Sequence, residues 1–216
     1  MAETSNTDRL RRRRPTSHER ESGRPWDESY SDGPAPWDIG RPQPAIAELI
    51  VEGVFAGDVL DAGCGTGEHA LAIASAGGHV LGVDVAETAL AMARAKAVER
   101  DLDVEFAAAD ALELHDLDRA FDTVLDCGLF HTFDAQERPR YVGSLASVTK
   151  QGGRLHVLCF SDEGENLGPH PVSRNALEAA FSADRGWRVV TIEASEIQTR
   201  FRAEGLPAWR AAIVRL

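Results

Sequence analysis

Glycines and carboxylates with a distinctive spacing lie between residues 59 and 84. The stretch Val59-Leu60-Asp61-Ala62-Gly63-Cys64-Gly65-Thr66-Gly67 begins as an apolar strand, and Asp84 ends a second apolar run, 17 residues after Gly67. The glycines let the backbone turn sharply and approach a ligand closely. A carboxylate at the end of the next strand is where doubly wound folds bind ribose hydroxyls. The pattern therefore predicts a site for a ligand that contains a ribose.

The charge of Asp61 indicates which kind of ribose-containing ligand fits this turn. A nicotinamide site presents a helix N-terminus to a pyrophosphate, and an acidic neighbour would repel that group. Asp61, two residues before Gly63, suits a ligand with a cationic amino group. S-adenosylmethionine has such a group, a ribose and no phosphate. A tight strand-to-helix turn that binds no ligand is the alternative interpretation.

Three segments resemble a known enzyme family. Residues 61–67 resemble motif I of the class I S-adenosylmethionine-dependent methyltransferases. The segment Pro36-Trp37-Asp38-Ile39-Gly40-Arg41-Pro42-Gln43-Pro44 resembles the entry segment of their thiopurine methyltransferase-like small-molecule branch, and Gly168-Pro169-His170-Pro171-Val172-Ser173 is similar to the same branch. The resemblance covers about residues 36–216. It implies S-adenosylmethionine as cofactor and a small aromatic or heterocyclic acceptor, methylated on O, N or S, as in bacterial heterocyclic toxin methyltransferases that act on quinolone-like compounds.

The resemblance also implies the residues that bind the cofactor. Asp84 would hold the ribose, Asp110 would accept a hydrogen bond from the adenine amino group, and Trp37 would close over the methionine end as part of a lid. For Asp110 a turn cap, and for Trp37 a core anchor on the first helix, are the alternatives. The implied cofactor site consists of Trp37, Asp61, Gly63, Gly65, Asp84, Asp110, Ala111 and Cys127.

The loop after the fourth predicted strand is the expected acceptor site, because ligands of open α/β sheets lie beyond the carboxyl ends of the strands. This loop reads Gly128-Leu129-Phe130-His131-Thr132-Phe133. It lacks the Asn/Asp-Pro-Pro-Tyr/Phe signature of enzymes that methylate exocyclic amines of nucleobases or glutamine amides. Its aromatic residues suit an aromatic acceptor. The expected acceptor pocket consists of Phe130, Phe133, Phe160 and His170.

His131 is the best candidate for a general base. Methyl transfer is an in-line displacement that mainly requires positioning, but a hydroxyl or ring N–H must also lose its proton, and imidazole suits that task near neutral pH. Two alternatives remain open. His131 can be a structural residue that hydrogen-bonds the backbone at the strand end, and an acceptor that arrives already ionised needs no base.

The elements that position these residues alternate between strand and helix patterns, which predicts an α/β fold. We expect a Rossmann-like class I methyltransferase, with a mostly parallel seven-stranded sheet and a C-terminal antiparallel hairpin whose turn lies at Gly205–Pro207. A polar tail, residues 1–34, is expected to be disordered or lid-forming, with Trp26 and Tyr30 able to dock locally. Residues 35–216 form the methyltransferase domain. The predicted strands are 59–62, 79–84, 103–106, 121–127, 154–160, 187–194 and 208–216.

Composition excludes several classes of function. The chain has 216 residues, is 43% hydrophobic and has a formal net charge of −12. Residues 1–36 contain seven arginines and seven acids, so the whole negative charge belongs to the body, and such a body repels nucleic acid. The run Arg11–Arg14 either contacts an acidic partner or is a solvated part of the tail.

The remaining patterns place the protein in the cytoplasm, as a monomer without metal. The three cysteines lack metal-ligand spacing, and Asp126 with Asp162 lacks a third oxygen ligand. No apolar stretch is long enough to span a membrane, and no secretory signal is visible. Two rival functions stay open: a non-catalytic module that binds S-adenosylmethionine, and a nicotinamide-dependent oxidoreductase.

Overall fold

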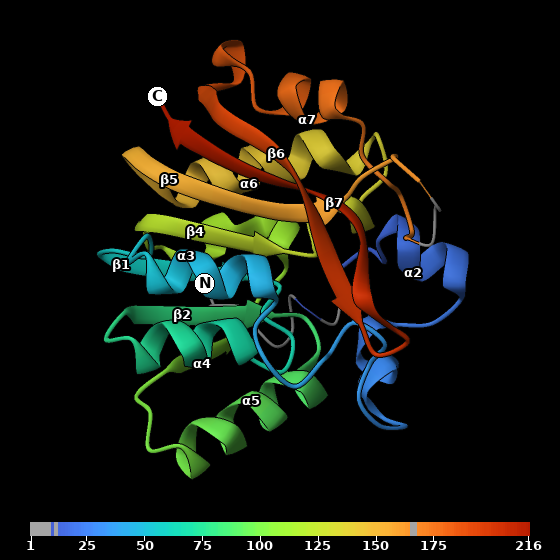
Figure 1. Cartoon of the computed structure of the whole chain (residues 1–216), viewed down its shortest axis with the longest axis vertical. Helices are drawn as coiled ribbons and strands as arrows, with labels where there is room; N and C mark the ends of the chain where they lie inside the picture. Colours follow the sequence, from blue (N-terminus) through green and yellow to red (C-terminus); the bar gives the residue numbers. More distant parts are fainter. Residues whose placement is uncertain (1–9, 11–12, 165–167) are drawn as a thin grey trace, which may run out of the picture.

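The protein is built around one mixed β-sheet (Figure 1). The computed structural model describes residue 10 and residues 13–164 and 168–216. The strand order is β3-β2-β1-β4-β5-β7-β6, in which β1 to β5 pair in parallel and β7 pairs antiparallel to both β5 and β6. The expected fold class is therefore confirmed. The strands are β1 (Asp58–Ala62), β2 (His79–Asp84), β3 (Glu105–Ala108), β4 (Phe121–Cys127), β5 (Thr149–Phe160), β6 (Trp187–Thr199) and β7 (Arg202–Arg215).

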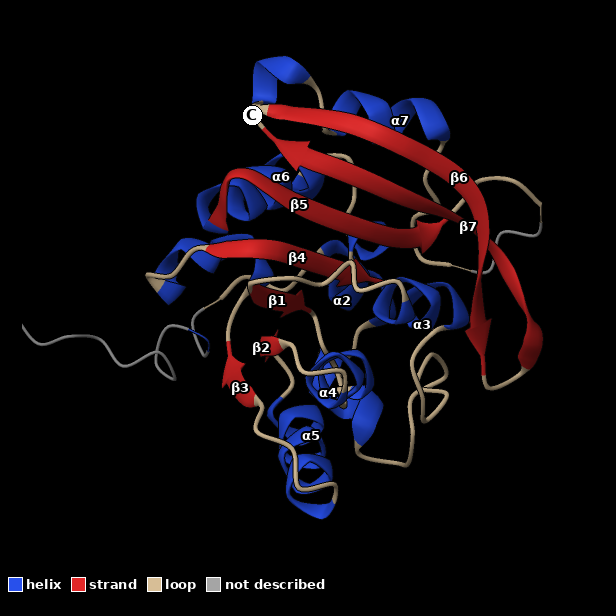
Figure 2. Ribbon diagram, turned by 60° about the vertical axis from the view of Figure 1, so that its left-hand side comes forward, coloured by secondary structure: helices blue, strands red, loops and turns tan. Residues whose placement is uncertain are grey.

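Helices cover both faces of the sheet, which explains why the central strands are apolar along their length. Val59 of β1 packs into the cluster formed with α3, α4 and α5, whereas its neighbour Leu60 packs into the cluster formed with η2, α6 and α7. Figure 2 shows the helices on either side of the sheet. They are α3 (Pro44–Val51), α4 (Glu68–Ser75), α5 (Glu87–Glu99), η2 (Ala111–Leu117), η3 (Phe130–Thr132), α6 (Glu137–Val148), α7 (Arg174–Ala180) and η4 (Ala183–Arg185).

Local sequence signals account for the helix ends. Pro44 occupies the first turn of α3, where its missing N–H costs no hydrogen bond. Ser173 caps α7, since its side chain accepts a hydrogen bond from the Ala176 amide at 3.1 Å.

Residues 13–34, where we expected a disordered or lid-forming tail, are folded against the domain. They contain α2 (Ser17–Ser22) and η1 (Trp26–Tyr30). A capping box opens α2, in which the Thr16 and Glu19 side chains each bond the other residue's backbone amide. The buried Glu19 carboxylate also accepts hydrogen bonds from Arg13 and from the Trp26 amide. Polar contacts therefore order residues 13–34, which contain few apolar side chains and which we call the N-terminal segment. Residues 1–9, 11 and 12, including part of the arginine run, lie outside the described residues.

Ser17, Arg20 and Asp27 of this segment contact the domain. These contacts place α2 beyond the carboxyl ends of the parallel strands (Figure 1). The Ser17 hydroxyl donates to the Glu137 carboxylate at 2.6 Å, and Arg20 forms an ion pair with the same carboxylate at 3.1 Å. Asp27 accepts from both the amide and the hydroxyl of Thr88, at 2.8 and 2.9 Å, near the start of α5. The segment therefore covers the edge where ligands of such sheets bind.

The closing hairpin is longer than expected. The predicted turn at Gly205–Pro207 is wrong, because these residues belong to β7 and pair with β6, and the chain reverses at residues 200 and 201. Pro207 pairs with Glu196 of β6, and its carbonyl accepts a hydrogen bond from the Ser161 amide at 3.0 Å, so its missing N–H removes a ladder bond only where β5 has already ended at Phe160. β5 is also longer than expected, because Thr149 already pairs with Phe121 of β4, whereas the predicted strand began at residue 154.

Candidate functional site

A cavity of about 380 Å³ lies at the carboxyl ends of the parallel strands, a size within the range of small-molecule sites. The N-terminal segment and the β6–β7 hairpin contribute to its walls. Most of the predicted site residues line it together, and three of them do not: Asp61, Phe130 and His170. The predicted residues in the lining are Trp37, Gly63, Gly65, Asp84, Asp110, Ala111, Cys127, His131, Phe133 and Phe160.

The glycine turn after β1 needs glycine for two reasons. Gly63, Gly65 and Gly67 all have positive φ, a conformation that L side chains rarely adopt. Space is also short, since a Cβ at Gly65 would lie 3.1 Å from the Tyr30 hydroxyl and one at Gly67 would lie 2.8 Å from the Ala93 Cβ. The turn thus brings the backbone against the cavity and lets α4 begin directly behind it.

Asp84, at the end of β2, holds this turn in place. Its carboxylate accepts hydrogen bonds from the Gly65 amide at 2.8 Å and from the Ala86 amide at 2.9 Å. Asp110, at the end of β3, accepts from the Leu112 amide at 2.9 Å and so caps η2. Burial raises the pKa of both carboxyls. Asp84 and Asp110 both line the cavity, as expected for residues that bind a ribose and an adenine.

Asp61 lies beneath the turn and outside the cavity lining. It is 1% exposed, and its carboxylate accepts a hydrogen bond from the Ala70 amide in α4 at 3.1 Å. Burial, with further repulsion from Asp84 and Asp126, raises the pKa of Asp61 to about 7. The expected direct contact with a cationic ligand is therefore absent from this geometry. The carboxyl can still act through the field that it creates at the turn.

We call Asp38, Asp61, Asp84 and Asp110 the acidic floor. Arg13 lines the same cavity, but its guanidinium is bound to Glu19, and it acts on Asp84 and Asp110 only at longer range. A ligand that carries positive charge would supply what the floor lacks, whereas a pyrophosphate would be repelled. The residues present therefore fit the sulfonium and amino group of S-adenosylmethionine.

Asp126 fixes the loop that follows β4. This fully buried carboxylate accepts hydrogen bonds from the Tyr141 hydroxyl at 2.8 Å and from the amides of Leu129 and Phe130 at 3.0 and 3.1 Å. Burial raises its pKa to about 6. Its oxygens are thus engaged in positioning residues 128–133.

The entry segment joins three parts of the site. Trp37 donates its indole N–H to the Tyr30 hydroxyl at 3.2 Å, and Asp38 accepts from the Thr66 hydroxyl at 2.7 Å. The Gln43 side chain forms two hydrogen bonds with the Gln198 backbone, at 2.9 and 2.8 Å. The Gln43 backbone amide donates to the His69 ring at 3.1 Å. The entry segment is therefore fixed to both α4 and the hairpin, with Trp37 over the cavity.

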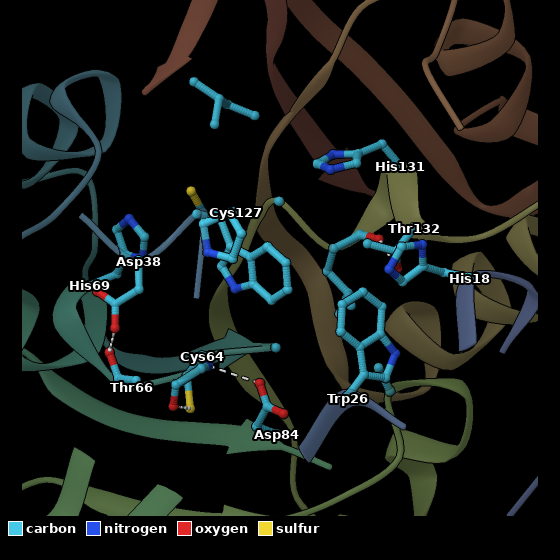
Figure 3. Close-up of a pocket in the computed structure, with 18 of the residues that line it drawn as sticks. His18, Trp26, Asp38, Cys64, Thr66, His69, Asp84, Cys127, His131 and Thr132 are labelled. Atoms are coloured by element: carbon cyan, nitrogen blue, oxygen red, sulfur yellow. Dashed lines mark hydrogen bonds between the residues drawn. The ribbon is translucent and has the colours of Figure 1, made fainter. Parts of the chain in front are cut away.

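His131 points into the cavity from η3 (Figure 3). It is 5% exposed, and its Nδ1 accepts a hydrogen bond from the Phe160 amide at 3.2 Å. Burial, together with the nearby charges of Arg138, His18 and His170, lowers the pKa of His131 to about 3. The imidazole is therefore neutral at physiological pH.

His18, His131, Thr132, Phe133 and Phe160 form what we call the histidine wall. His18 stacks on Trp26 with ring centroids 4.6 Å apart, and the His131 and Phe160 rings are 4.4 Å apart. In Figure 3, His18, His131 and Thr132 lie across the pocket from Asp38 and Thr66. Among the described residues, the lining from β4, β5, η3 and the hairpin contains no carboxylate. The two sides of the cavity therefore differ in charge.

Phe130 and His170 were expected in the acceptor pocket but lie behind it. Phe130 is fully buried in the core against Tyr141 and Phe181, because successive side chains of the short helix η3 point in different directions. The backbone amide of His170 donates to the His131 carbonyl at 3.1 Å, and its Nε2 lies 3.7 Å from the Glu21 carboxylate. Both residues support the wall without lining the cavity.

Several lining residues were not predicted from the sequence. Five of them belong to residues 13–34, which we had expected to be disordered or lid-forming. One signal was available, because Thr16-Ser17-His18-Glu19 matches the capping-box pattern that marks a helix start. The unpredicted residues include Arg13, Thr16, His18, Trp26, Tyr30, Thr66, His69, Thr132 and Phe201.

None of the helices in the described ranges is both long and apolar enough to cross a membrane.

Comparisons with known proteins agree with this site. The family described as "Methyltransferase domain" matches residues 59–153. The chain is 38% identical, over 75% of its length and 72% of the relative's, to a 2-heptyl-1-hydroxyquinolin-4(1H)-one methyltransferase of Mycobacteroides abscessus. It is 31% identical, over 86% and 84%, to a probable thiol methyltransferase 2 of Arabidopsis thaliana.

A solved structure from work on the conversion of a disulfide bond into a thioacetal group during echinomycin biosynthesis is also similar. It shares 37% identity with this chain, with a TM-score of 0.74, over 83% of this chain and 84% of the other.

Proposed function

We propose an acceptor for this chain, which belongs to the class I S-adenosylmethionine-dependent methyltransferases, in the thiopurine methyltransferase-like branch. The acceptor is a small aromatic or heterocyclic compound, quinolone-like or another toxin, and it is methylated on O, N or S. The enzyme uses S-adenosylmethionine and a small-molecule acceptor. One observation carries the choice of acceptor. Three carboxylates of the acidic floor, those of Asp38, Asp84 and Asp110, line one cavity together with the histidine wall, whose own residues include no carboxylate.

The acidic floor binds and orients the cofactor. When bound, S-adenosylmethionine supplies a methyl group on a sulfonium, which is open to in-line displacement. Asp84 accepts from the ribose hydroxyls, Asp110 and the Ala111 backbone hold the adenine, and Gly63 and Gly65 allow close approach of the backbone. Trp37 covers the methionine end, and Cys127 lies between the floor and the histidine wall (Figure 3).

The histidine wall orients the acceptor. Phe133 and Phe160 provide apolar surface for a flat ring, and Trp26 and Trp37 cover it from the N-terminal segment. Ile197, Phe201 and Leu206 extend this surface along the hairpin, which suits an apolar substituent. Exclusion of water from such a pocket favours a reaction in which opposite charges cancel.

We further propose that the enzyme works in the cytoplasm, as a monomer, and on no nucleic acid. All three cysteines are free thiols, which suits a reducing compartment. A net charge of −12 opposes binding to a phosphate backbone. A non-catalytic cofactor-binding module is the rival function, and its mark would be tight cofactor binding without turnover.

The test uses S-adenosylmethionine with an isotopically labelled methyl group. The purified protein is incubated with hydroxyquinolones, phenols, N-heterocycles and aryl thiols, and products are identified by mass. Labelled product from one class would support the proposal and name the atom type. Cofactor binding without product from any class would favour the non-catalytic module. Absence of cofactor binding would contradict both.

A further inference from the structure

The hydrogen bond at His131 decides which of its ring nitrogens carries the proton. Nδ1 accepts from the Phe160 amide at 3.2 Å, so Nδ1 has its lone pair directed at that N–H. A neutral imidazole has one protonated and one unprotonated nitrogen, and the proton therefore lies on Nε2. A general base in the cavity would need the opposite tautomer, in which Nδ1–H and the Phe160 N–H would face each other as two donors.

The surroundings of His131 stabilise this arrangement. The His131 carbonyl accepts from the His170 amide, and the His170 carbonyl accepts from Arg138 of α6 at 2.5 Å. η3, β5, α6 and the loop before α7 thus hold the backbone and the ring together. A ring rotated by 180° would leave the half-buried Phe160 amide without this hydrogen-bond partner, which is costly.

The charges near His131 also favour an anion in front of it. Arg138, His18 and His170 are the titratable groups that act on this imidazole, and all three are basic, whereas the Glu21 carboxylate acts on His18 and lies 3.7 Å from the His170 Nε2. The Arg138 guanidinium forms no ion pair with any carboxylate in the described part of the chain, and its Nε is buried without a hydrogen-bond partner. The carboxylates in the described lining come from the other side of the cavity, as Asp38, Glu68, Asp84 and Asp110.

We propose that the acceptor enters with its nucleophilic atom already ionised, and that His131 donates a hydrogen bond from Nε2 to this atom instead of removing a proton. This inference rests on the proposed function and narrows it to acidic acceptors, such as aryl thiols, N-hydroxy heterocycles and electron-poor phenols. His131 is then a residue that binds and aligns the anion.

The transfer balances without any base. A lone pair of the acceptor anion forms the new bond to the methyl carbon and displaces sulfur, which keeps the electron pair of the broken bond. The negative charge of the acceptor and the positive charge of the sulfonium cancel, and no proton is released. A neutral alcohol or ring N–H would instead require a proton acceptor, which His131 does not offer in this tautomer.

A first experiment reads the tautomer directly. Protein labelled with ¹⁵N in its histidines is studied by NMR, and His131 is assigned by comparison with His131→Gln. An unprotonated Nδ1 with a protonated Nε2 between pH 6 and 8 is the expected result. A protonated Nδ1 would overturn the proposal, even if no acceptor had been found.

A second experiment measures the ionisation of a bound acceptor. The protein is saturated with S-adenosylhomocysteine, and 4-nitrophenol is titrated with pH while its anion absorbance is recorded. We expect the bound pKa to fall by about one unit below that of free 4-nitrophenol, in line with one charge-assisted hydrogen bond. His131→Gln, which keeps a donor, should retain most of the shift, and His131→Phe should lose it. An unshifted or raised pKa would contradict the proposal.

The third experiment separates an ionised acceptor from a general base. Across phenols of graded pKa, kcat/KM should rise with pH at a midpoint that follows the acceptor's pKa. His131→Phe should lower kcat/KM by about tenfold to hundredfold without moving this midpoint. The matched control is His115→Gln, at an exposed position outside the cavity. A midpoint that stays fixed for all acceptors and vanishes in His131→Gln or His18→Gln would identify a histidine base and reject the inference. Failure of the labelled-methyl test with every acceptor would reject the proposed function instead.

Discussion

The two sides of the cavity solve opposite electrostatic problems. In the acidic floor, burial raises the pKa of Asp61, Asp84 and Asp110, so negative charge is held there at a cost. In the histidine wall, burial lowers the pKa of His131 and His18, so the imidazoles stay neutral. In the described part of the chain, no cation forms an ion pair with the floor carboxylates, and the wall offers donors without a carboxylate. Each side is therefore complementary to a different reactant, the floor to a sulfonium and the wall to an electron-rich acceptor.

The largest expected effect tests the floor through the pH dependence of stability. A carboxyl whose pKa rises on folding binds more protons in the folded state, so its contribution to the free energy of unfolding falls as pH rises. For Asp61 the window runs from about 4, the unfolded value, to about 7. Asp61→Asn should therefore match the wild type near pH 4 and be more stable by up to about 4 kcal/mol at pH 8, measured by urea denaturation without cofactor.

The wall should show the opposite sign. The pKa of His131 is about 3 in the folded protein, below its unfolded value of about 6.5, so His131 contributes stability at neutral pH that is lost as pH falls through this range. Urea denaturation of His131→Gln should show a smaller loss of stability than the wild type between pH 6.5 and 4. Equal pH dependence of the free energy of unfolding in the wild type and both variants would contradict the opposite pKa shifts of floor and wall.

The next effect concerns cofactor affinity. Asp84→Ala removes a carboxylate that holds the Gly65 and Ala86 amides and faces the ribose. We expect S-adenosylmethionine affinity to fall about hundredfold, as for the loss of a hydrogen-bonded charged group. Calorimetric titration measures it. Glu52→Gln, a change of one charge at an exposed position, is the control and should leave affinity unchanged.

A smaller effect tests the glycine turn. Gly65→Ala places a side chain at φ +53° and within 3.1 Å of the Tyr30 hydroxyl. We expect a loss of about 1–2 kcal/mol in the free energy of unfolding, from the left-handed conformation alone. Gly143→Ala is the matched control, because Gly143 lies in α6 with open space around its Cα. It should stabilise the protein by about 1 kcal/mol. A neutral Gly65→Ala would show that the turn relaxes easily.

The smallest expected effect tests how the N-terminal segment closes the cavity over both sides. Ser17→Ala removes the hydrogen bonds to the Glu137 carboxylate and the Thr132 carbonyl. We expect cofactor dissociation to accelerate about fivefold, corresponding to about 1 kcal/mol, in a stopped-flow displacement experiment. Ser31→Ala, which removes only a local contact within η1, should not change the rate. Equal rates in all three proteins would separate the segment from cofactor retention.

The sequence predicted the sheet, the glycine turn and the positions of Asp84 and Asp110 because their signals are local. Three glycines, a carboxylate at the end of β2 and another after β3 are each determined by one strand and the turn that follows it. The antiparallel end of the sheet was also predicted. The position of its turn was not, because only the pairing of β7 with β6 explains why Gly205 and Pro207 can lie within a strand.

The wall was harder to predict because its residues depend on tertiary contacts. Phe130 and His131 are adjacent, and only the packing of η3 sends the first into the core and the second into the cavity. Low apolar content in residues 13–34 suggested disorder, yet Glu19 organises this segment through polar contacts that composition does not reveal. The tautomer of His131 likewise follows from a residue of β5, 29 positions away.

Glu19 has a consequence for the order of events during turnover. Its carboxylate is bonded within the N-terminal segment, to Arg13, Thr16 and Trp26, whereas Ser17, Arg20 and Asp27 connect the segment to the domain. The internal contacts of the segment do not depend on its contacts with the domain, so the segment can move away from the domain as one folded unit, like a gate. Breaking those outer contacts would open the cavity that the segment helps to line and let the spent cofactor leave. The maximal rate would then be governed by the opening of this gate, and slow product exit would be its kinetic signature.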